Sequence, residues 1–265
     1  MPRKIAVLFC ALLYAAPALG QEYDCLIEAR QKVEVRSPVE AVIETIRVNR
    51  GDYVRKGDVL VTLESGAEKA ALELARSRAS MQGEINAAQA RLQLARKKWE
   101  QAQELYEQKF VSATSRDEAV ADYRLASEQL RQAKENQILA QLEVKRTAEI
   151  LALRTIRSPL DGVVVQKVLS PGDLATSNLK DPILKLVQIN PLNVEVVLPV
   201  SAFGGIKPGA KATVFPEAPI GGKYRATVKI VDRVVDAASG TFGVRLELPN
   251  RQGRIPPGIK CRVSF

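Results

Sequence analysis

The chain has 265 residues, a formal charge of +9 and an ordinary share of hydrophobic residues, which allow roughly one to three domains. It contains no histidine and only two methionines, so imidazole proton transfer and metal sites built from His or Met ligands are excluded. Its basic residues are interspersed with glutamates rather than gathered around aromatic side chains, so nucleic acid is not an expected partner.

Residues 1–20 have the composition of a secretory signal peptide. A basic start at Arg3 is followed by an apolar run, and small residues precede the expected cleavage point after Gly20. The run is too short for a comfortable transmembrane helix, although retention as an uncleaved anchor stays open. We therefore expect an exported protein.

Residues 21–36 follow with partial alternation of apolar and polar side chains, which indicates an amino-terminal strand. Short β-rich runs continue over residues 37–65, where Gly-Asp steps begin at Gly51 and Gly57. Such steps are turn signals, so this region predicts a small β module.

The stretch over residues 66–154 is the most regular in the chain. Residues 67–158 contain no proline, and Gly83 is their only glycine, so long helices are expected. Mostly apolar residues recur at heptad spacing, and each predicted helix pairs a row of small residues with a row of large ones. In the first helix the rows are Met81, Ala88, Ala95 and Ala102, and Ile85, Leu92, Trp99 and Tyr106. In the second they are Ala119, Ala126, Ala133, Ala140 and Thr147, and Tyr123, Leu130, Gln137, Val144 and Leu151.

A break near residues 109–114 leaves room only for a reversal, so the two helices should be antiparallel neighbours. The first helix, roughly residues 66–108, would be on the order of 60 Å long. The alternative is a compact helical bundle, but the polar faces are too broad for one. We predict a coiled-coil hairpin.

An internal repeat frames this hairpin. The string that begins at Ser37 returns at Ser158, and Gly51-Asp52 matches Gly172-Asp173 at the same offset. Each half is too small to bury a core by itself. We therefore expect residues 37–65 and 155–189 to pair as one sandwich, with the hairpin inserted at its edge. Residues 190–265 then contain five strand-like runs separated by Gly and Pro turns, which predicts a small antiparallel barrel.

The half-motifs, SPVEAVIE…GD and SPLDGVVV…GD, resemble the halves of lipoyl/biotinyl-type sandwiches, and a long hairpin between them is similar to the periplasmic adaptor, or membrane fusion, proteins. The segments ASGTFGVRLELPN and IPPGIKCRV resemble the β-barrel domain of that family. The resemblance implies an elongated, multidomain α+β protein. One departure is Ala41, which stands where Gly162 stands in the second half; a left-handed turn there would strain alanine, so we expect an altered turn.

The resemblance further implies a periplasmic adaptor, held at the inner membrane by its partners, that links an inner-membrane efflux transporter to an outer-membrane channel. Resistance-nodulation-division pumps are the best match, and copies of such adaptors often form a ring of six around a sealed conduit. Adaptors of those pumps usually carry a membrane-proximal domain after the barrel, and we do not expect one in this chain. Two alternatives remain: an adaptor for an ATP-binding-cassette secretion system, and a periplasmic coiled-coil scaffold without a transport role.

The free end of the hairpin is the candidate docking site for the outer-membrane channel. Leu105, Ser112 and Asp117 fit the tip pattern of the family, whereas Gln101 stands where arginine is usual. Phe110 and Val111 at the turn add two apolar residues to this candidate set. The side chain of Gln101 carries no charge and cannot form the paired hydrogen bonds of an arginine guanidinium. The contact with the channel should therefore be weaker than in the family, or should match a different channel surface. The alternative is that the apolar members only cap the coil.

Cys25 and Cys261 are the cysteines that remain after leader removal. In an oxidising periplasm they can pair if the amino-terminal strand completes the barrel, or they can be two separate buried thiols. Neither catalysis nor a cofactor is expected: no Ser-His pair, nucleophile elbow or phosphate loop exists, and Lys69 lacks the surroundings of a lipoylated lysine.

Overall fold

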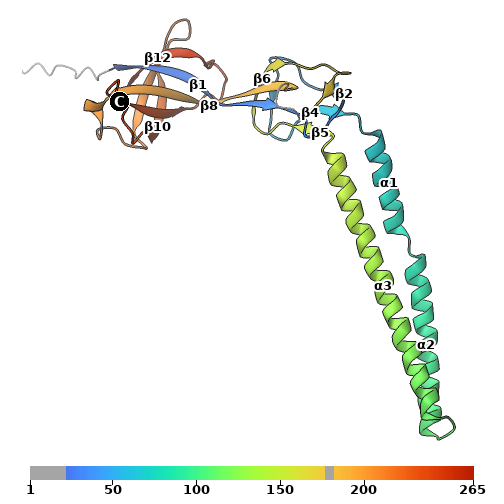
Figure 1. The fold of residues 1–265 in the computed structure, drawn as a ribbon. Helices are drawn as coiled ribbons and strands as arrows, with labels where there is room; N and C mark the ends of the chain where they lie inside the picture. The colour runs from blue at the N-terminus through green and yellow to red at the C-terminus, as the bar shows by residue number, and fades with distance from the viewer. Residues whose placement is uncertain (1–21, 177–181) are drawn as a thin grey trace, which may run out of the picture. The chain divides into compact units, whose positions relative to one another are not determined.

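The computed structural model describes residues 22–176 and 182–265; the expected signal peptide at residues 1–20 lies outside them. The chain divides into two compact units. One comprises the chain up to Val33, Leu160–Val165 and Leu186–Phe265, and the other comprises Glu34–Pro159 and Gln166–Lys185. Strands β1 and β8 run from one unit into the other (Figure 1).

The first unit is built on an antiparallel barrel, as the sequence predicts. Its strands follow the order β1-β12-β9-β10-β11-β8, and pairing of β1 with β8 closes it. The bounds are β1 Glu22–Val35, β8 Leu184–Pro199, β9 Lys211–Pro216, β10 Tyr224–Val231, β11 Thr241–Leu248 and β12 Ile259–Ser264, with a short 3-10 turn at Val200–Ala202.

Alternation along the strands explains the barrel core. In β11, Phe242, Val244, Leu246 and Leu248 are buried, whereas the residues between them are more exposed. β8 pairs with β11 in register and repeats the pattern from Leu192 to Leu198. Because successive strand residues point to opposite faces, this period of two fills the barrel interior with branched side chains.

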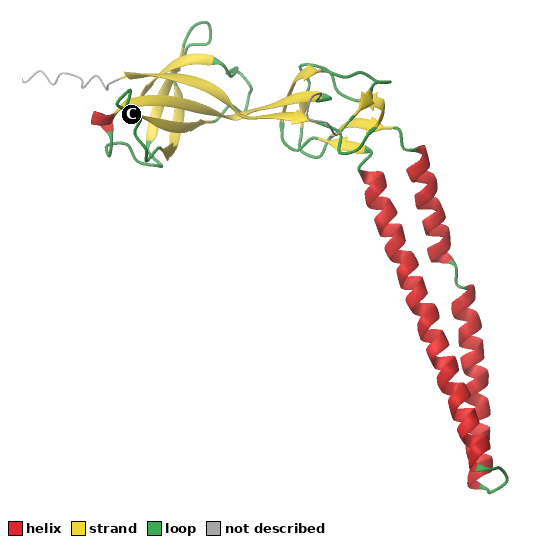
Figure 2. Cartoon of the chain, viewed as in Figure 1, coloured by secondary structure: helices red, strands yellow, loops and turns green. Residues whose placement is uncertain are grey.

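The second unit contains a four-stranded sheet in the order β5-β4-β2-β7 (Figure 2). The bounds are β2 Ala41–Ile46, β4 Val59–Leu63, β5 Thr155–Arg157 and β7 Leu174–Ala175. The short strands β6, Gly162–Lys167, and β3, Tyr53–Val54, follow β8 at the end of the eight-stranded sheet that contains the barrel strands. Ala41 pairs with Ala175, and Val59 pairs with Arg157. The two repeats therefore form one sheet, as the split-sandwich prediction requires.

The repeats also share a turn. The Asp52 carboxylate accepts a hydrogen bond from the backbone N–H of Asn49 at 2.7 Å, and Asp173 accepts one from Ser170 at 2.7 Å. Gly51 and Gly172 precede these aspartates with φ of 96° and 94°. Glycine adopts this left-handed backbone without a Cβ penalty, which explains the Gly-Asp pair in each half.

The expectation of an altered turn at Ala41, which assumed a left-handed turn at the corresponding Gly162, was wrong. Neither residue has a positive φ. Gly162 is instead required by close packing, because a Cβ at this position would lie 2.5 Å from the carbonyl oxygen of Val187. Ala41 pairs regularly with Ala175 of the edge strand β7, where a methyl group is accommodated.

The helical hairpin consists of α1 (Gly66–Ser80), α2 (Gly83–Glu107) and α3 (Ala113–Ala152). The antiparallel pairing was predicted, but the prediction of one continuous first helix was wrong. Met81 is extended, with ψ of 122°, and its side chain is 69% exposed rather than part of the seam. Gly83 lies two residues further on, and its low helix propensity makes an interruption least costly at this point of the hairpin.

The rest of the predicted seam is present. Ile85 and Ala88 of α2 pack against Leu130 and Ala133 of α3. Closer to the tip, the large rows of the two helices meet as Trp99 and Tyr123, whose rings stack with centroids 5.1 Å apart. Small residues between these contacts allow the helices to approach each other closely.

Candidate functional site

The turn at the free end of the hairpin is short and well ordered by hydrogen bonds. α2 ends at Glu107, and Lys109 takes a left-handed conformation with φ of 63°. The hydroxyl of Ser112 caps α3 by accepting a hydrogen bond from the backbone N–H of Ser115 at 3.1 Å. Ser112 therefore starts the second helix, a role that its position in the tip pattern does not reveal.

Two apolar side chains of the predicted set point into solvent at this end. Phe110 is 74% exposed and Leu105 is 41% exposed, while Val111 is half-buried. Exposure of an aromatic ring at the apex leaves apolar area uncovered in the single chain. The tip thus presents an apolar surface that a partner can cover.

Arg116 is a tip residue that the sequence did not single out. Its guanidinium lies 4.5 Å from the ring centroid of Tyr106, and its Nη2 donates to Asp117 Oδ1 at 2.6 Å. The hydrogen bond to Asp117 is the main cause that raises the pKa of Arg116 above its ordinary value. This cluster joins the last turn of α2 to the first turn of α3. Its only signals in the sequence were an aromatic residue, Tyr106, shortly before the turn and the adjacent pair Arg116-Asp117 shortly after it.

Gln101 lies apart from that cluster. It is exposed on α2, and its side chain forms no hydrogen bond within the described part of the chain. The charge of Arg116 is balanced by Asp117 next to it, so it does not stand in as a free cation. Neither Gln101 nor Arg116 therefore supplies an unpaired positive charge at this end of the hairpin.

The base of the hairpin is fixed to the sandwich. The N–H of Leu63, at the end of β4, donates to the carbonyl of Arg154 at 2.8 Å. The guanidinium of Arg154 in turn binds the Glu68 carboxylate in the first turn of α1, and both side chains are largely buried. These contacts hold the two points of insertion together.

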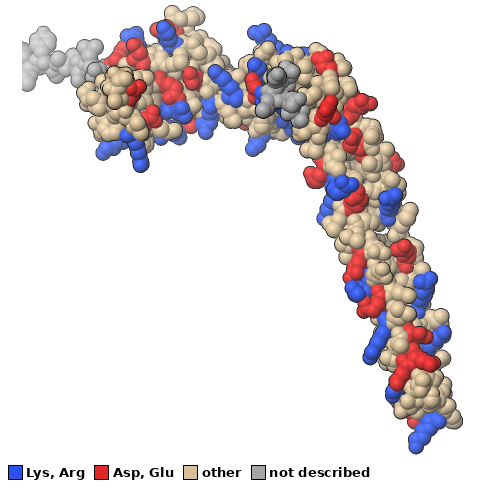
Figure 3. Space-filling view, viewed as in Figure 1, with Lys and Arg blue, Asp and Glu red and all other residues tan. Residues whose placement is uncertain are grey.

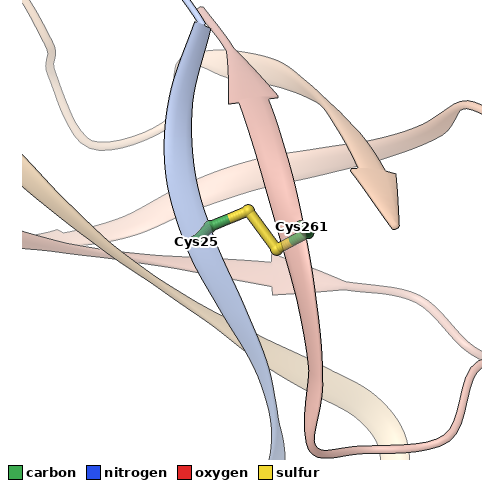
Figure 4. Close-up of a disulfide and its surroundings, with 2 residues drawn as sticks. All are labelled: Cys25 and Cys261. Carbon is green, nitrogen blue, oxygen red and sulfur yellow. A yellow bond between two sulfur atoms is a disulfide. The ribbon is translucent and has the colours of Figure 1, made fainter. Parts of the chain in front are cut away.

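The barrel carries the disulfide. Cys25 of β1 and Cys261 of β12 are directly opposite each other, and their sulfur atoms are bonded at 2.08 Å (Figure 4). Both residues are buried. The first and last strands of the barrel are thus covalently joined.

Within residues 22–176 and 182–265, no group of three or more His, Cys, Asp or Glu side chains is arranged to hold a metal ion. The helices of the same ranges include none with the length and apolar character needed to cross a bilayer. On the face of the hairpin shown in Figure 3, Lys and Arg lie among Asp and Glu without forming a single-sign patch.

Comparison with known families agrees with this architecture. A family model for the CzcB-like, barrel-sandwich hybrid domain matches residues 31–180, and one for the CusB-like, beta-barrel domain matches residues 192–265. The chain belongs to the membrane fusion protein family of periplasmic adaptors. Members of this family are structural linkers.

The names of the curated relatives of this adaptor refer to different exported substrates. It is 26% identical to the cobalt-zinc-cadmium resistance protein CzcB of Cupriavidus metallidurans, over 84% of this chain and 40% of the relative. It is 26% identical to the multidrug resistance protein MdtE of Escherichia coli, over 85% and 58%. It is 28% identical to the efflux pump periplasmic linker BepD of Brucella suis, over 92% and 62%. The chain thus spans about two fifths to three fifths of these relatives.

Solved structures show the same fold. The crystal structure of MacA from Actinobacillus actinomycetemcomitans has a TM-score of 0.77 at 22% identity, covering 93% of this adaptor and 78% of that chain. The membrane fusion protein Spr0693 from Streptococcus pneumoniae has a TM-score of 0.62 at 16% identity, covering 92% and 97%. At these identities the likeness concerns architecture only.

Proposed function

We propose that this adaptor links an inner-membrane efflux transporter to an outer-membrane channel, and that its copies form a ring, of six in the simplest case, around the exported substrate. The observation that carries the proposal is the free end of the hairpin. Phe110 and Leu105 are exposed there, while the opposite end is anchored by the Arg154–Glu68 pair. A rigid coil with an uncovered apolar tip is suited to reach a distant partner.

The adaptor itself would perform no chemistry. Transport energy would come from the transporter, and the substrate would pass through the ring interior. Family membership supports this reading, because the family consists of linkers that work between other components. The relatives named above differ in cargo, so the proposal is limited to the bridging role.

Site-specific photo-crosslinking in cells tests the bridge. A probe at Phe110 should capture an outer-membrane channel, and a probe at Val234, which is exposed in the loop after β10, should capture the inner-membrane transporter. A third probe at Leu94, exposed on the shaft of α2, is the matched control and should capture no channel. Mass spectrometry identifies each product.

The outcomes separate the alternatives. Failure of the Phe110 probe to capture any outer-membrane protein, with folded and exported adaptor, would overturn the bridging function. Capture of an ATP-binding-cassette protein at Val234 would assign the adaptor to a secretion system, whereas capture of a transporter without an ATPase would assign it to the efflux class.

A further inference from the structure

Segment 200–211, which joins β8 to β9, exposes apolar side chains at one end of the barrel. Val200 is 50% exposed and Phe203 is 49% exposed. The backbone N–H of Phe203 donates to the carbonyl of Val200 at 2.9 Å, and the ring of Phe203 packs edge-on against the ring of Phe242, with centroids 5.1 Å apart. The ring is thus fixed against the core on one side and left in solvent on the other.

The two ends of the barrel differ in this exposure. At the opposite end, the loops 217–223 and 249–258 are described in full and expose no large apolar side chain. At the end that carries segment 200–211, the loop after β10 adds Val234, which is 81% exposed. Because one end of the barrel closes without uncovered apolar area, the fold does not require such area at the other end, and its presence there indicates a surface for a partner.

The same segment carries positive charge. Lys207 and Lys211 are exposed, and neither forms an ion pair within the described part of the chain. No Asp or Glu occurs between residues 196 and 216, and the loop after β10 adds Arg233 and two aspartates, so segment and loop together remain net positive. Apolar side chains beside lysines are the composition of surfaces that bind an anionic bilayer, where the apolar groups enter the headgroup region and the lysines meet lipid phosphates.

The point at which the leader joins the barrel is a second, independent observation. Glu22 of β1 pairs with Ser264 of β12, and Ser264 pairs with Thr213 of β9, so residues 1–21 join the barrel at the end that carries the segment. Residues 17–21 separate the apolar run of the leader from β1, and five residues span at most about 17 Å. While the leader is in the bilayer, this end of the barrel therefore lies within reach of the lipid headgroups.

We infer that segment 200–211 binds the surface of an anionic bilayer: Val200 and Phe203 enter the headgroup region, and Lys207 and Lys211 contact lipid phosphates. This contact goes beyond the bridging role and does not depend on it, because it holds the adaptor at the inner membrane through lipid as well as through protein partners. The neighbouring Val234 stays available to the transporter, which lies in the same membrane. Two apolar side chains and two lysines give a weak, reversible contact, which strengthens attachment that another component provides.

Tryptophan fluorescence with lipid vesicles tests the apolar part of the contact. In residues 21–265, Trp99→Phe removes the only native tryptophan, and Phe203→Trp adds a probe to the segment. Vesicles of phosphatidylglycerol and phosphatidylcholine should shift its emission to shorter wavelength, and brominated acyl chains should quench it. Leu26→Trp in the same background, at a residue that is 38% exposed on β1, is the matched control and should show neither change.

Lysine variants test the phosphate contact. In sedimentation with the same vesicles, the Lys207→Ala, Lys211→Ala double variant should bind about 25-fold more weakly than the unchanged chain. The matched control is the Lys223→Ala, Lys260→Ala double variant, which removes two exposed lysines from other parts of the barrel and has the same net charge. It should bind as the unchanged chain does.

Three results would overturn the inference: no emission shift for Phe203→Trp, equal shifts for Phe203→Trp and Leu26→Trp, or equal losses of binding in the two lysine variants. If vesicles do not bind the chain and a photo-crosslinking probe at Val200 captures only the transporter in cells, the segment belongs to the transporter contact instead. None of these results affects capture of a channel by the Phe110 probe, so failure of the lipid contact is distinguishable from failure of the bridging function.

Discussion

The guanidinium of Arg116 lies over the ring of Tyr106, and this contact closes the hairpin tip from one helix to the other. Because it spans the turn, it holds Lys109 and Phe110 in one arrangement. Arg116→Ala should therefore increase amide hydrogen exchange over residues 107–113 while the shaft remains protected. Arg116→Lys, which keeps the charge but not the planar stack, should have a smaller effect. Unchanged exchange in Arg116→Ala would show that Ser112 alone orders the turn.

Docking through apolar contact at the tip makes a second prediction. Leu105→Asp places a charge on the exposed surface next to Phe110 and should abolish efflux, because the channel would have to desolvate a carboxylate. Leu94→Asp introduces the same change at an exposed leucine of the α2 shaft and should retain efflux. The measurement is drug or ion susceptibility at matched adaptor levels. Normal efflux with Leu105→Asp would contradict docking through this surface.

The disulfide should contribute strongly to barrel stability. Cys25 and Cys261 are 236 positions apart, so the bond removes much of the unfolded chain's freedom, corresponding to about 5 kcal/mol in the entropic model. Urea unfolding of the Cys25→Ser, Cys261→Ser double variant should show this loss. Wild-type protein under reducing conditions is the comparison, and it should unfold at the same urea concentration as the double variant. A difference below about 1 kcal/mol would indicate a compact unfolded state.

A buried amide holds the loop between β11 and β12. Asn250 donates to the carbonyls of Ile189 at 3.0 Å and Ile255 at 2.8 Å, and accepts from the Ile255 N–H at 3.2 Å. Asn250→Ala leaves these backbone groups unpaired, and should lower the free energy of unfolding by about 3 kcal/mol. Asn193→Ala, a similar change on the half-buried side of β8, should cost less than about 1 kcal/mol. Thermal unfolding of both variants decides between them.

Close packing at Gly162 gives the last prediction. A methyl group there meets both Val187 and Leu160 at less than 3 Å, so Gly162→Ala should destabilise its unit by about 2 kcal/mol through overpacking. Ala41→Gly, at the corresponding position of the other repeat, should cost only about 0.5–1 kcal/mol through backbone entropy. Equal losses in denaturant unfolding would show that position 162 has room for a side chain.

The sequence predicted those parts of the fold that depend on local periodicity. Alternation marked the barrel strands, and heptad spacing marked the contact of Trp99 with Tyr123. It did not predict the interruption at Met81, because Met81 occupies the first position of a heptad row and no proline marks a break there. Whether the helix continues depends on the balance between seam packing and the low helix propensity of Gly83.

The features that were missed depend on long-range geometry. Asn250 reaches backbone groups of Ile189, which no local pattern connects to it. The stack of Arg116 on Tyr106 depends on two side-chain conformations and on the shape of the turn. The reason for a glycine at position 162 was misread. The sequence alone does not distinguish a glycine that is needed for a left-handed turn from one that is needed because another part of the backbone lies close to it.

The points at which the hairpin enters and leaves the sandwich are adjacent: β4 and β5 pair directly, and Leu63 binds the backbone of Arg154. To the sandwich, the whole hairpin is therefore equivalent to a tight loop between two paired strands. Its length is set by nothing in the sheet, so whole heptads added to or removed from both helices together would alter the reach of the adaptor and leave the module at its base unchanged. Such a joint would let one base serve partners at different distances.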